Sequence, residues 1–290
     1  MGISIADIDA RFLARHRTFL AASYASCVPY LYAFHGQSLT RVFAAVAGAA
    51  VISAALTKAG AKAAYVRHLT GYVFSPETLS QASQETHEDF QQLKWDANIS
   101  PHSGVYIYDE DDMNAFAGSD HVYLGSEIES TLEREQTKFV MAHETDHLRW
   151  NDTVTTVLPY STPKMLTYVY SLGFGDLLYQ TLMLRKSVDA MAALQIQDNI
   201  STLLYAVPAV MASLVLTDLF QRATIRSAEY RCDANGVLMT KNPEAAKEAL
   251  IILSYGNGGD FDSGAGNLFA THPDLKRRVA NIDSLELEKT

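Results

Sequence analysis

The segment Met141–Leu148 reads Met-Ala-His-Glu-Thr-Asp-His-Leu, and it contains the order His-Glu-x-x-His. On a helix, residues four positions apart lie on one face, so His143 and His147 would present two imidazole rings one turn apart. This spacing is typical of a zinc site, and Glu144 would lie beside the rings as a general base. The alternative is a surface helix that carries two unrelated histidines. Further candidate ligands elsewhere in the sequence would favour the metal site over this alternative.

The composition indicates one sizeable folded domain or two small ones. The chain has 290 residues, of which 48% are hydrophobic, and this is enough apolar surface to bury a core. The formal net charge is −10, and no basic run is present, so nucleic acid is not an expected partner. Cys27 and Cys232 lie far apart in the sequence, which argues against a disulfide framework.

Two pairs of apolar runs lie on either side of the His-Glu-x-x-His segment. The first pair covers residues 19–34 and 42–57, and the second covers 166–184 and 199–217. Each pair predicts a helical hairpin that could cross a membrane. Arginine and lysine residues flank the first pair on both sides, which favours cytoplasmic ends. Membrane lipid is therefore an expected partner, and the alternative is a soluble cytoplasmic protein in which these helices are buried.

The remaining sequence predicts a mainly helical α+β protein with a small sheet. Pro76–Asn98 is expected to be a helix, and three short strands are expected at 103–108, 114–117 and 121–125. Ser130 and Glu133 form a candidate capping box for the helix that carries His143. The expected segments are an N-terminal hairpin at 1–66, a first catalytic part at 67–153, an inserted apolar hairpin at 154–220 and a second catalytic part at 221–290.

A candidate third ligand lies far downstream, in the stretch Glu229-Tyr230-Arg231-Cys232-Asp233. Zinc hydrolases hold the ion with three protein ligands and keep a fourth position open. If this stretch is helical, Glu229 and Asp233 share a face, so Glu229 could bind the metal while Asp233 orients an imidazole. Cys232 is a second candidate ligand, although a small buried side chain is the interpretation that its setting favours.

These motifs together resemble the HtpX and CAAX prenyl protease family of membrane zinc metalloproteases, and the layout is closest to its HtpX-like branch. The resemblance runs from about residue 65 to the C-terminus. The matching stretches are Asn114-Ala115-Phe116-Ala117, His143–His147 with Asp152, Arg226–Gly236, and Thr271-His272-Pro273 with Arg278.

The resemblance implies a gluzincin-type metalloprotease domain with one Zn²⁺ per chain, held by His143, His147 and Glu229. It implies an endopeptidase that acts on polypeptides, with a role in the quality control of membrane proteins. Glu144 would take a proton from the attacking water and pass it to the leaving amine. A proteolytically silent zinc-binding interaction protein in the membrane is the alternative, and the intact Glu144 argues against it.

Two further site assignments have open alternatives. His272 is a candidate donor to the oxyanion that forms during cleavage, or else it caps its own helix. The strand of Asn114, Ala115, Phe116 and Ala117 is a candidate for pairing with an extended substrate, or else it is an ordinary edge strand.

The chain departs from the family pattern at three features. Asp146 occupies a place usually held by a small or apolar residue, and it is expected to add negative charge near the ion. Cys232 replaces the usual alanine. The apolar helices are shorter and richer in tyrosine than the family's membrane helices.

Overall fold

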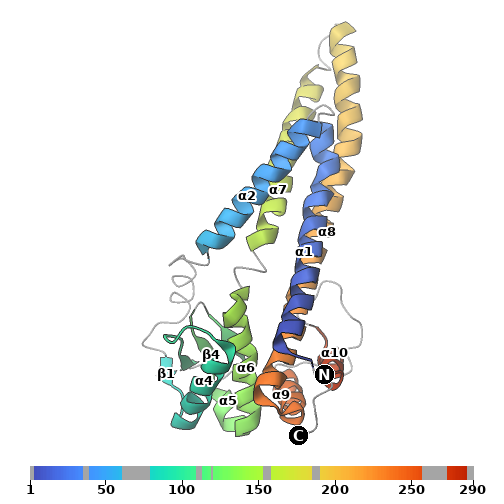
Figure 1. Ribbon diagram of the computed structural model, residues 1–290. Coiled ribbons are helices and arrows are strands. Elements are labelled where there is room, and N and C mark those ends of the chain that lie inside the picture. Colours follow the sequence, from blue (N-terminus) through green and yellow to red (C-terminus); the bar gives the residue numbers. More distant parts are fainter. Residues whose placement is uncertain are drawn as a thin grey trace. The chain divides into compact units, whose positions relative to one another are not determined.

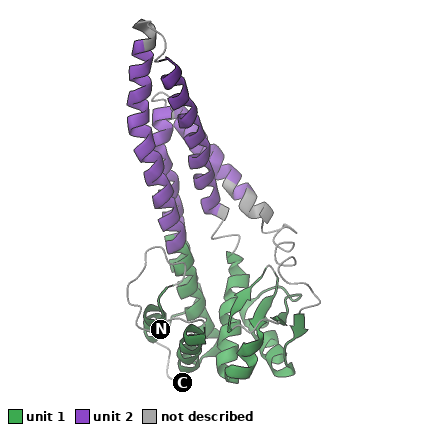
Figure 2. Ribbon diagram, turned by 180° about the vertical axis from the view of Figure 1, so that it is seen from behind, with its two compact units in different colours: residues 1–15, 60–155, 224–290 green, residues 16–59, 156–223 purple. Residues whose placement is uncertain are grey.

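The computed structural model describes residues 3–34, 39–60, 79–108, 113–118, 120–152, 158–184, 190–256 and 273–285. The chain forms two compact units (Figure 2). Unit 1 consists of residues 1–15, 60–155 and 224–290, and unit 2 consists of residues 16–59 and 156–223. The four-segment division expected from the sequence stays a prediction.

Unit 1 contains a four-stranded sheet in the order β1-β2-β4-β3. Its strands are β1 (Leu79–Gln81), β2 (Val105–Tyr108), β3 (Ala115–Ala117) and β4 (Val122–Gly125). The central pair β2–β4 is parallel, whereas β1 and β3 are antiparallel to their neighbours. All four residues of β4 are buried, and β3 forms one edge of the described sheet. The three predicted strands are therefore confirmed.

The prediction of a single helix at Pro76–Asn98 is wrong for its first part. Residues 79–81 form β1, and the helix α4 begins only at Gln84 and ends at Ala97. The Oγ atom of Ser83 accepts a hydrogen bond from the backbone N–H of Thr86, and this contact caps the first turn. The remaining residues of the predicted start, up to 78, lie outside the described part of the chain.

The helix that carries His143 is α6, which runs from Arg134 to Trp150. The predicted cap at Ser130 is wrong, because residues 126–131 form a separate short helix, α5 (Ser126–Thr131). Glu133 caps α6 instead: its side chain accepts from the backbone of Gln136, and Gln136 Oε1 accepts from the N–H of Glu133 at 3.0 Å. At the other end, Asn151 adopts a left-handed conformation with a φ of 48°, which stops the helix.

The core of unit 1 is built around α6. Figure 1 shows α6 beside the sheet, and α6 contacts β3, β4, α4 and α9 (Pro243–Gly256). A last helix, α10 (Leu275–Asp283), packs against α9. The buried apolar side chains of this core include Phe90, Leu93, Val122, Leu124, Phe139, Met141, Val237 and Ala249. This packing fixes the helix on which the histidines lie.

Unit 2 consists of parts of four long helices: α1 (Ile5–Phe34), α2 (Leu39–Gly60), α7 (Leu158–Leu184) and α8 (Ala190–Thr240). The sequence predicts that the second apolar run ends before the Glu229 helix begins. In the structure both belong to the continuous helix α8, because no glycine or proline follows Pro208 until Gly236.

One of the described helices is long and apolar enough to cross a membrane, and it covers Ala193–Thr240 within α8. The four helices follow one another as two consecutive pairs. The prediction that both pairs are transmembrane hairpins is not confirmed by this finding.

Candidate metal centre

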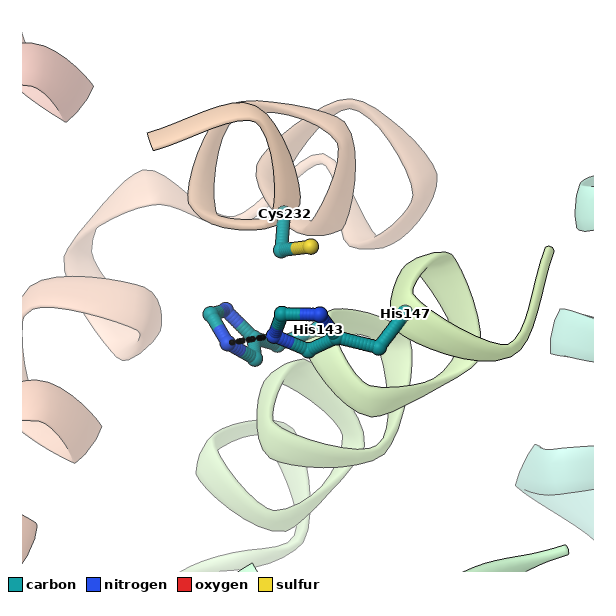
Figure 3. Close-up of side chains that lie close together, drawn as sticks. All are labelled: His143, His147 and Cys232. Carbon is teal, nitrogen blue, oxygen red and sulfur yellow. Dashed lines mark hydrogen bonds between the residues drawn. The ribbon is translucent and has the colours of Figure 1, made fainter. Parts of the chain in front are cut away.

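The two histidines of α6 face the same point. The Nε2 atoms of His143 and His147 lie 3.2 Å apart, and Figure 3 shows the two rings close together on one helix. His143 is 6% exposed, so one ring is nearly out of contact with bulk water. The spacing of one helical turn thus brings two imidazole nitrogens into the same small space, as the sequence predicts.

Glu229 on α8 completes a set of three donors. Its Oε1 lies 3.6 Å from Nε2 of His147, and its Oε2 lies 3.7 Å from Nε2 of His143. A tetrahedral zinc site with bonds of about 2.1 Å to nitrogen and oxygen has donors about 3.4 Å apart. The three observed separations lie close to that edge length, so these residues fit a zinc ion. Glu144 is adjacent, with Oε1 4.0 Å from Nε2 of His143.

Cys232 is the competing third donor. Its Sγ and one nitrogen from each ring all lie within 4.8 Å of one another, and it reaches the site from α8, as Figure 3 shows. The Sγ also lies 3.2 Å from Nη2 of Arg231. Burial raises the pKa of the Cys232 thiol, and this opposes the thiolate form that metals bind. The geometry and the protonation state therefore favour Glu229.

A carboxylate supports each imidazole from behind. Nδ1 of His147 lies 2.7 Å from Oδ2 of Asp152, and Nδ1 of His143 lies 3.0 Å from Oδ1 of Asp233. The contact of His147 with Asp152 is a hydrogen bond, which fixes the tautomer and the ring orientation of a metal-binding histidine so that Nε2 carries the free electron pair. Asp233 lies at ion-pair distance from the ring of His143. Asp233 lies where the sequence analysis expects it. In the sequence, Asp152 stands out only as part of the motif, five residues after His147. In the structure, its carboxylate contacts the ring of that histidine.

The charges around the rings favour a cation. Burial alone would lower the pKa of His147, but its hydrogen bond with Asp152 and the nearby carboxylate of Glu144 outweigh burial and raise that pKa well above the usual range. Burial alone would raise the pKa of Asp233, but Arg278 and His143 outweigh it and hold that pKa below the usual range. The surroundings thus stabilise positive charge at the rings and negative charge on their partners.

Arg278 on α10 lies next to the site. In the sequence it stands out only as the arginine that follows the Thr-His-Pro motif. Its guanidinium donates to both carboxylate oxygens of Asp233, at 2.6 and 2.8 Å. The same group lies 3.8 Å from Oε2 of Glu229. Arg278 therefore holds Asp233 in place and faces the candidate third ligand.

A cleft of about 490 Å³ opens over the two histidines. The candidate substrate strand, from Asn114 to Ala117, lines it together with His143, Glu144 and Glu229. The apolar side chains that line it are Met113, Phe116, Phe139, Val140, Leu250, Leu253 and Leu275. A peptide in this cleft would therefore meet a strand edge, apolar surface and the candidate metal site together.

His272 lies outside the described residues, although the next residue, Pro273, lines the cleft. Asp146 is fully buried, and its carboxylate accepts hydrogen bonds from Arg231, Arg149 and Asn235 at 2.7, 3.0 and 3.1 Å. The expected excess of negative charge from Asp146 is therefore offset by two arginines.

The comparisons with known proteins point in one direction. A family model described as "Peptidase family M48" matches residues 80–286. The chain is also similar to curated proteins named "Protease HtpX homolog". The one from Streptococcus uberis is 26% identical over 203 residues, which cover 63% of this chain and 67% of the relative. The one from Salinibacter ruber is 25% identical over 244 residues, which cover 73% of this chain and 79% of the relative.

Proposed function

Because the chain belongs to peptidase family M48, we propose that it is a zinc-dependent endopeptidase with Glu144 as the general base. The observation that carries this proposal is the meeting of His143, His147 and Glu229. Their donor atoms lie 3.2 to 3.7 Å apart at a cleft that Glu144 also lines. These three residues would hold the ion.

The protein side of the reaction falls mainly to Glu144. A bound zinc ion supplies a Lewis acid that polarises the peptide carbonyl and lowers the pKa of the attacking water to about 7. Glu144 accepts the proton from that water and delivers it to the leaving amine. Its side chain lines the cleft beside the rings, so it can serve both transfers. His272 is our candidate for a donor to the oxyanion.

The substrate strand supports binding of an extended peptide. Along β3, Gly118 N–H donates to the carbonyl of His121, and Gly125 N–H donates to the carbonyl of Asn114. In an antiparallel ladder, every second residue turns its backbone groups toward the partner strand. Residues 114, 116 and 118 therefore face β4, and the backbone groups of Ala115 and Ala117 face the other way. A substrate would pair with that edge.

The side-chain distribution of unit 2 supports a membrane location. Hydroxyl groups lie inside the unit: Ser213 Oγ lies 3.0 Å from Ser26 Oγ and 3.3 Å from Thr167 Oγ1, and Tyr30 contacts Thr167 at 3.2 Å. Large apolar side chains lie outside. Exposed examples are Phe43, Val51, Met165, Tyr168, Val169, Leu172, Leu204, Tyr205 and Met211.

Polar contacts inside and apolar surface outside are the arrangement that helices need in lipid. We infer a multi-pass membrane protein whose first hairpin has both ends in the cytoplasm and whose catalytic unit is cytoplasmic. A protease of this kind, similar to HtpX homologues, would act on membrane proteins in quality control.

Replacing the base while keeping the metal tests this function. We expect Glu144→Gln to abolish cleavage of casein and to leave the zinc content unchanged, because the amide cannot accept the proton. Glu135→Gln on the exposed side of the same helix is the matched control, and it should keep full activity. Undiminished cleavage by pure Glu144→Gln would contradict the role of Glu144. A wild-type protein that binds zinc and cleaves nothing would favour the silent interaction protein.

A further inference from the structure

A cluster of buried and half-buried charged side chains connects to His147 through Asp152. Its members are Asp9, Asp146, Arg149, Asp152 and Arg231, and we call it the charge cluster. All five belong to unit 1, and Asp9 comes from the start of α1. Asp146 and Arg231 are 0% and 2% exposed. Burying charges at this depth costs free energy unless each one is paired. The partner of each charge in the cluster therefore has to be identified.

Arg231 is the centre of the charge cluster. Its Nη2 donates to Oδ2 of Asp152 at 2.6 Å, and its Nε donates to Oδ2 of Asp146 at 2.7 Å. Asp152 Oδ2 is also the atom that lies 2.7 Å from Nδ1 of His147. One carboxylate oxygen is thus shared between the arginine and the candidate metal ligand. Any displacement of Arg231 would therefore move or re-aim the partner of His147.

Two aromatic rings pack on Arg231, one from the first turns of α1 and one from the last turn of α6. The ring centroids of Phe12 and Trp150 lie 4.5 and 4.9 Å from its guanidinium carbon. The two rings also contact each other edge to face at 5.3 Å. Aromatic faces attract a guanidinium, and more strongly so when water is excluded. Phe12 is 5% exposed, so the N-terminal segment shields the cation.

Asp9 links this segment to α6, the helix that carries the two candidate histidine ligands. It forms an ion pair with Arg149, and it accepts hydrogen bonds from Trp150 Nε1 and Asn235 Nδ2 at 3.2 Å each. Arg149 and Asn235 both also donate to Asp146. The path of contacts therefore runs from Asp9 through Arg149, Asp146, Arg231 and Asp152 to His147.

From these contacts we propose that the charge cluster is a positioning device for His147, and that the N-terminal residues Asp9 and Phe12 are part of it. Asp146, Arg149 and Arg231 do not touch the metal position, and they act through Asp152 on the ring. This inference rests on the proposed zinc site. It explains why a charged residue stands at position 146 inside the His-Glu-x-x-His segment.

The test measures zinc affinity by competition with a chromophoric chelator, using the purified full-length chain in detergent. Removing an outer hydrogen-bond partner of a ligand typically weakens metal binding about 10- to 100-fold. We expect Asp146→Asn, which is isosteric, to weaken zinc binding by about tenfold. Asp9→Asn should weaken it by a smaller but measurable factor, on the order of threefold. Asp7→Asn, on the exposed side of the same helix, should leave the affinity unchanged.

A charge exchange separates positioning from a loss of folding. The double variant Asp9→Arg with Arg149→Asp should restore part of the affinity that the single variants Asp9→Arg and Arg149→Asp lose, because the ion pair between positions 9 and 149 is rebuilt. At saturating zinc, Asp9→Asn should recover its kcat with an unchanged KM, since the effect acts through the metal ligand. The visible spectrum of the cobalt-loaded protein should shift in Asp146→Asn.

The outcomes distinguish the two proposals. If the wild-type chain binds no zinc, the proposed function fails and the positioning role fails with it. If the wild type binds zinc while Asp146→Asn and Asp9→Asn are folded and bind it equally well, only the positioning role is overturned. Lower affinity in the single variants, with recovery in the exchanged pair, is the result that the charge cluster predicts.

Discussion

At the scale of single residues, the site depends on which side chain completes the pair of histidines. Glu229 presents one oxygen to each Nε2 atom, at 3.6 and 3.7 Å. Cys232 lies in a looser group, and burial raises the pKa of its thiol. Glu229 is therefore our proposed third ligand.

A pair of substitutions tests this assignment. Glu229→Ala should weaken zinc binding by more than about 100-fold, beyond the range that outer partners of a ligand contribute. Cys232→Ala should keep the affinity within about threefold, because the thiol contributes no bond to the metal. Metal analysis after dialysis checks both, with thermal unfolding as the control for folding. The reverse pattern would assign the third position to Cys232.

Residue-level prediction from the sequence succeeds where the geometry is local. The spacing of His143 and His147 within one helix predicts their meeting. The contact between Asp9 and Arg149 joins positions 140 residues apart, and no periodic pattern marks such a pair. For that reason the sequence reveals Asp146 as unusual and does not reveal its partners.

At the scale of elements, α6 and β3 form two sides of the candidate site. The strands at 103–108 and 121–125 are predictable because β-branched and aromatic residues stand between turn residues. The strand at 114–117 has only Phe116 as a residue of this kind. The strand β1 cannot be predicted in this way, because it is only three residues long and its conformation depends on pairing with β2. The sequence misplaces the start of α6 because two capping patterns overlap. Ser130 and Glu133 predict the earlier start, whereas Glu133 and Gln136 form the cap in the structure.

The open edge of β3 gives a prediction for substrate binding. Ala117→Pro should lower kcat/KM for peptides about tenfold, because it removes one N–H that would bond to the substrate, at a cost of about 1 to 1.5 kcal/mol. The ladder to β4 should persist, since residue 117 faces away from that strand. Ala117→Ser keeps the N–H and serves as the control. Equal kcat/KM for the proline variant would argue against pairing of substrate with β3.

At the scale of the whole molecule, the two units differ in how they place polar groups. Unit 1 has an apolar core beneath a charged site. Unit 2 keeps Ser213, Thr167 and Tyr30 in contact inside it and exposes large apolar side chains. Apolar runs predict these helices, but they do not predict that α8 continues without a break from unit 2 to the Glu229 site in unit 1.

The surface of unit 2 predicts how the chain will fractionate. We expect the protein to stay in the membrane pellet after an alkaline carbonate wash and to enter solution only with detergent, since its exposed apolar side chains need lipid or a substitute. Immunoblotting of the pellet and the supernatant measures this. Recovery of folded protein in the carbonate supernatant would support the soluble alternative.

We propose that peptide cleavage depends on a zinc ion held by this chain, and the predictions for the candidate site rest on this dependence. The most direct measurement pairs the zinc content of the detergent-purified protein with casein cleavage, before chelation, after chelation and after zinc is returned. We expect one zinc per chain, loss of cleavage when the metal is removed, and recovery when it is restored. Cleavage that continues at an unchanged rate in zinc-free protein would contradict it.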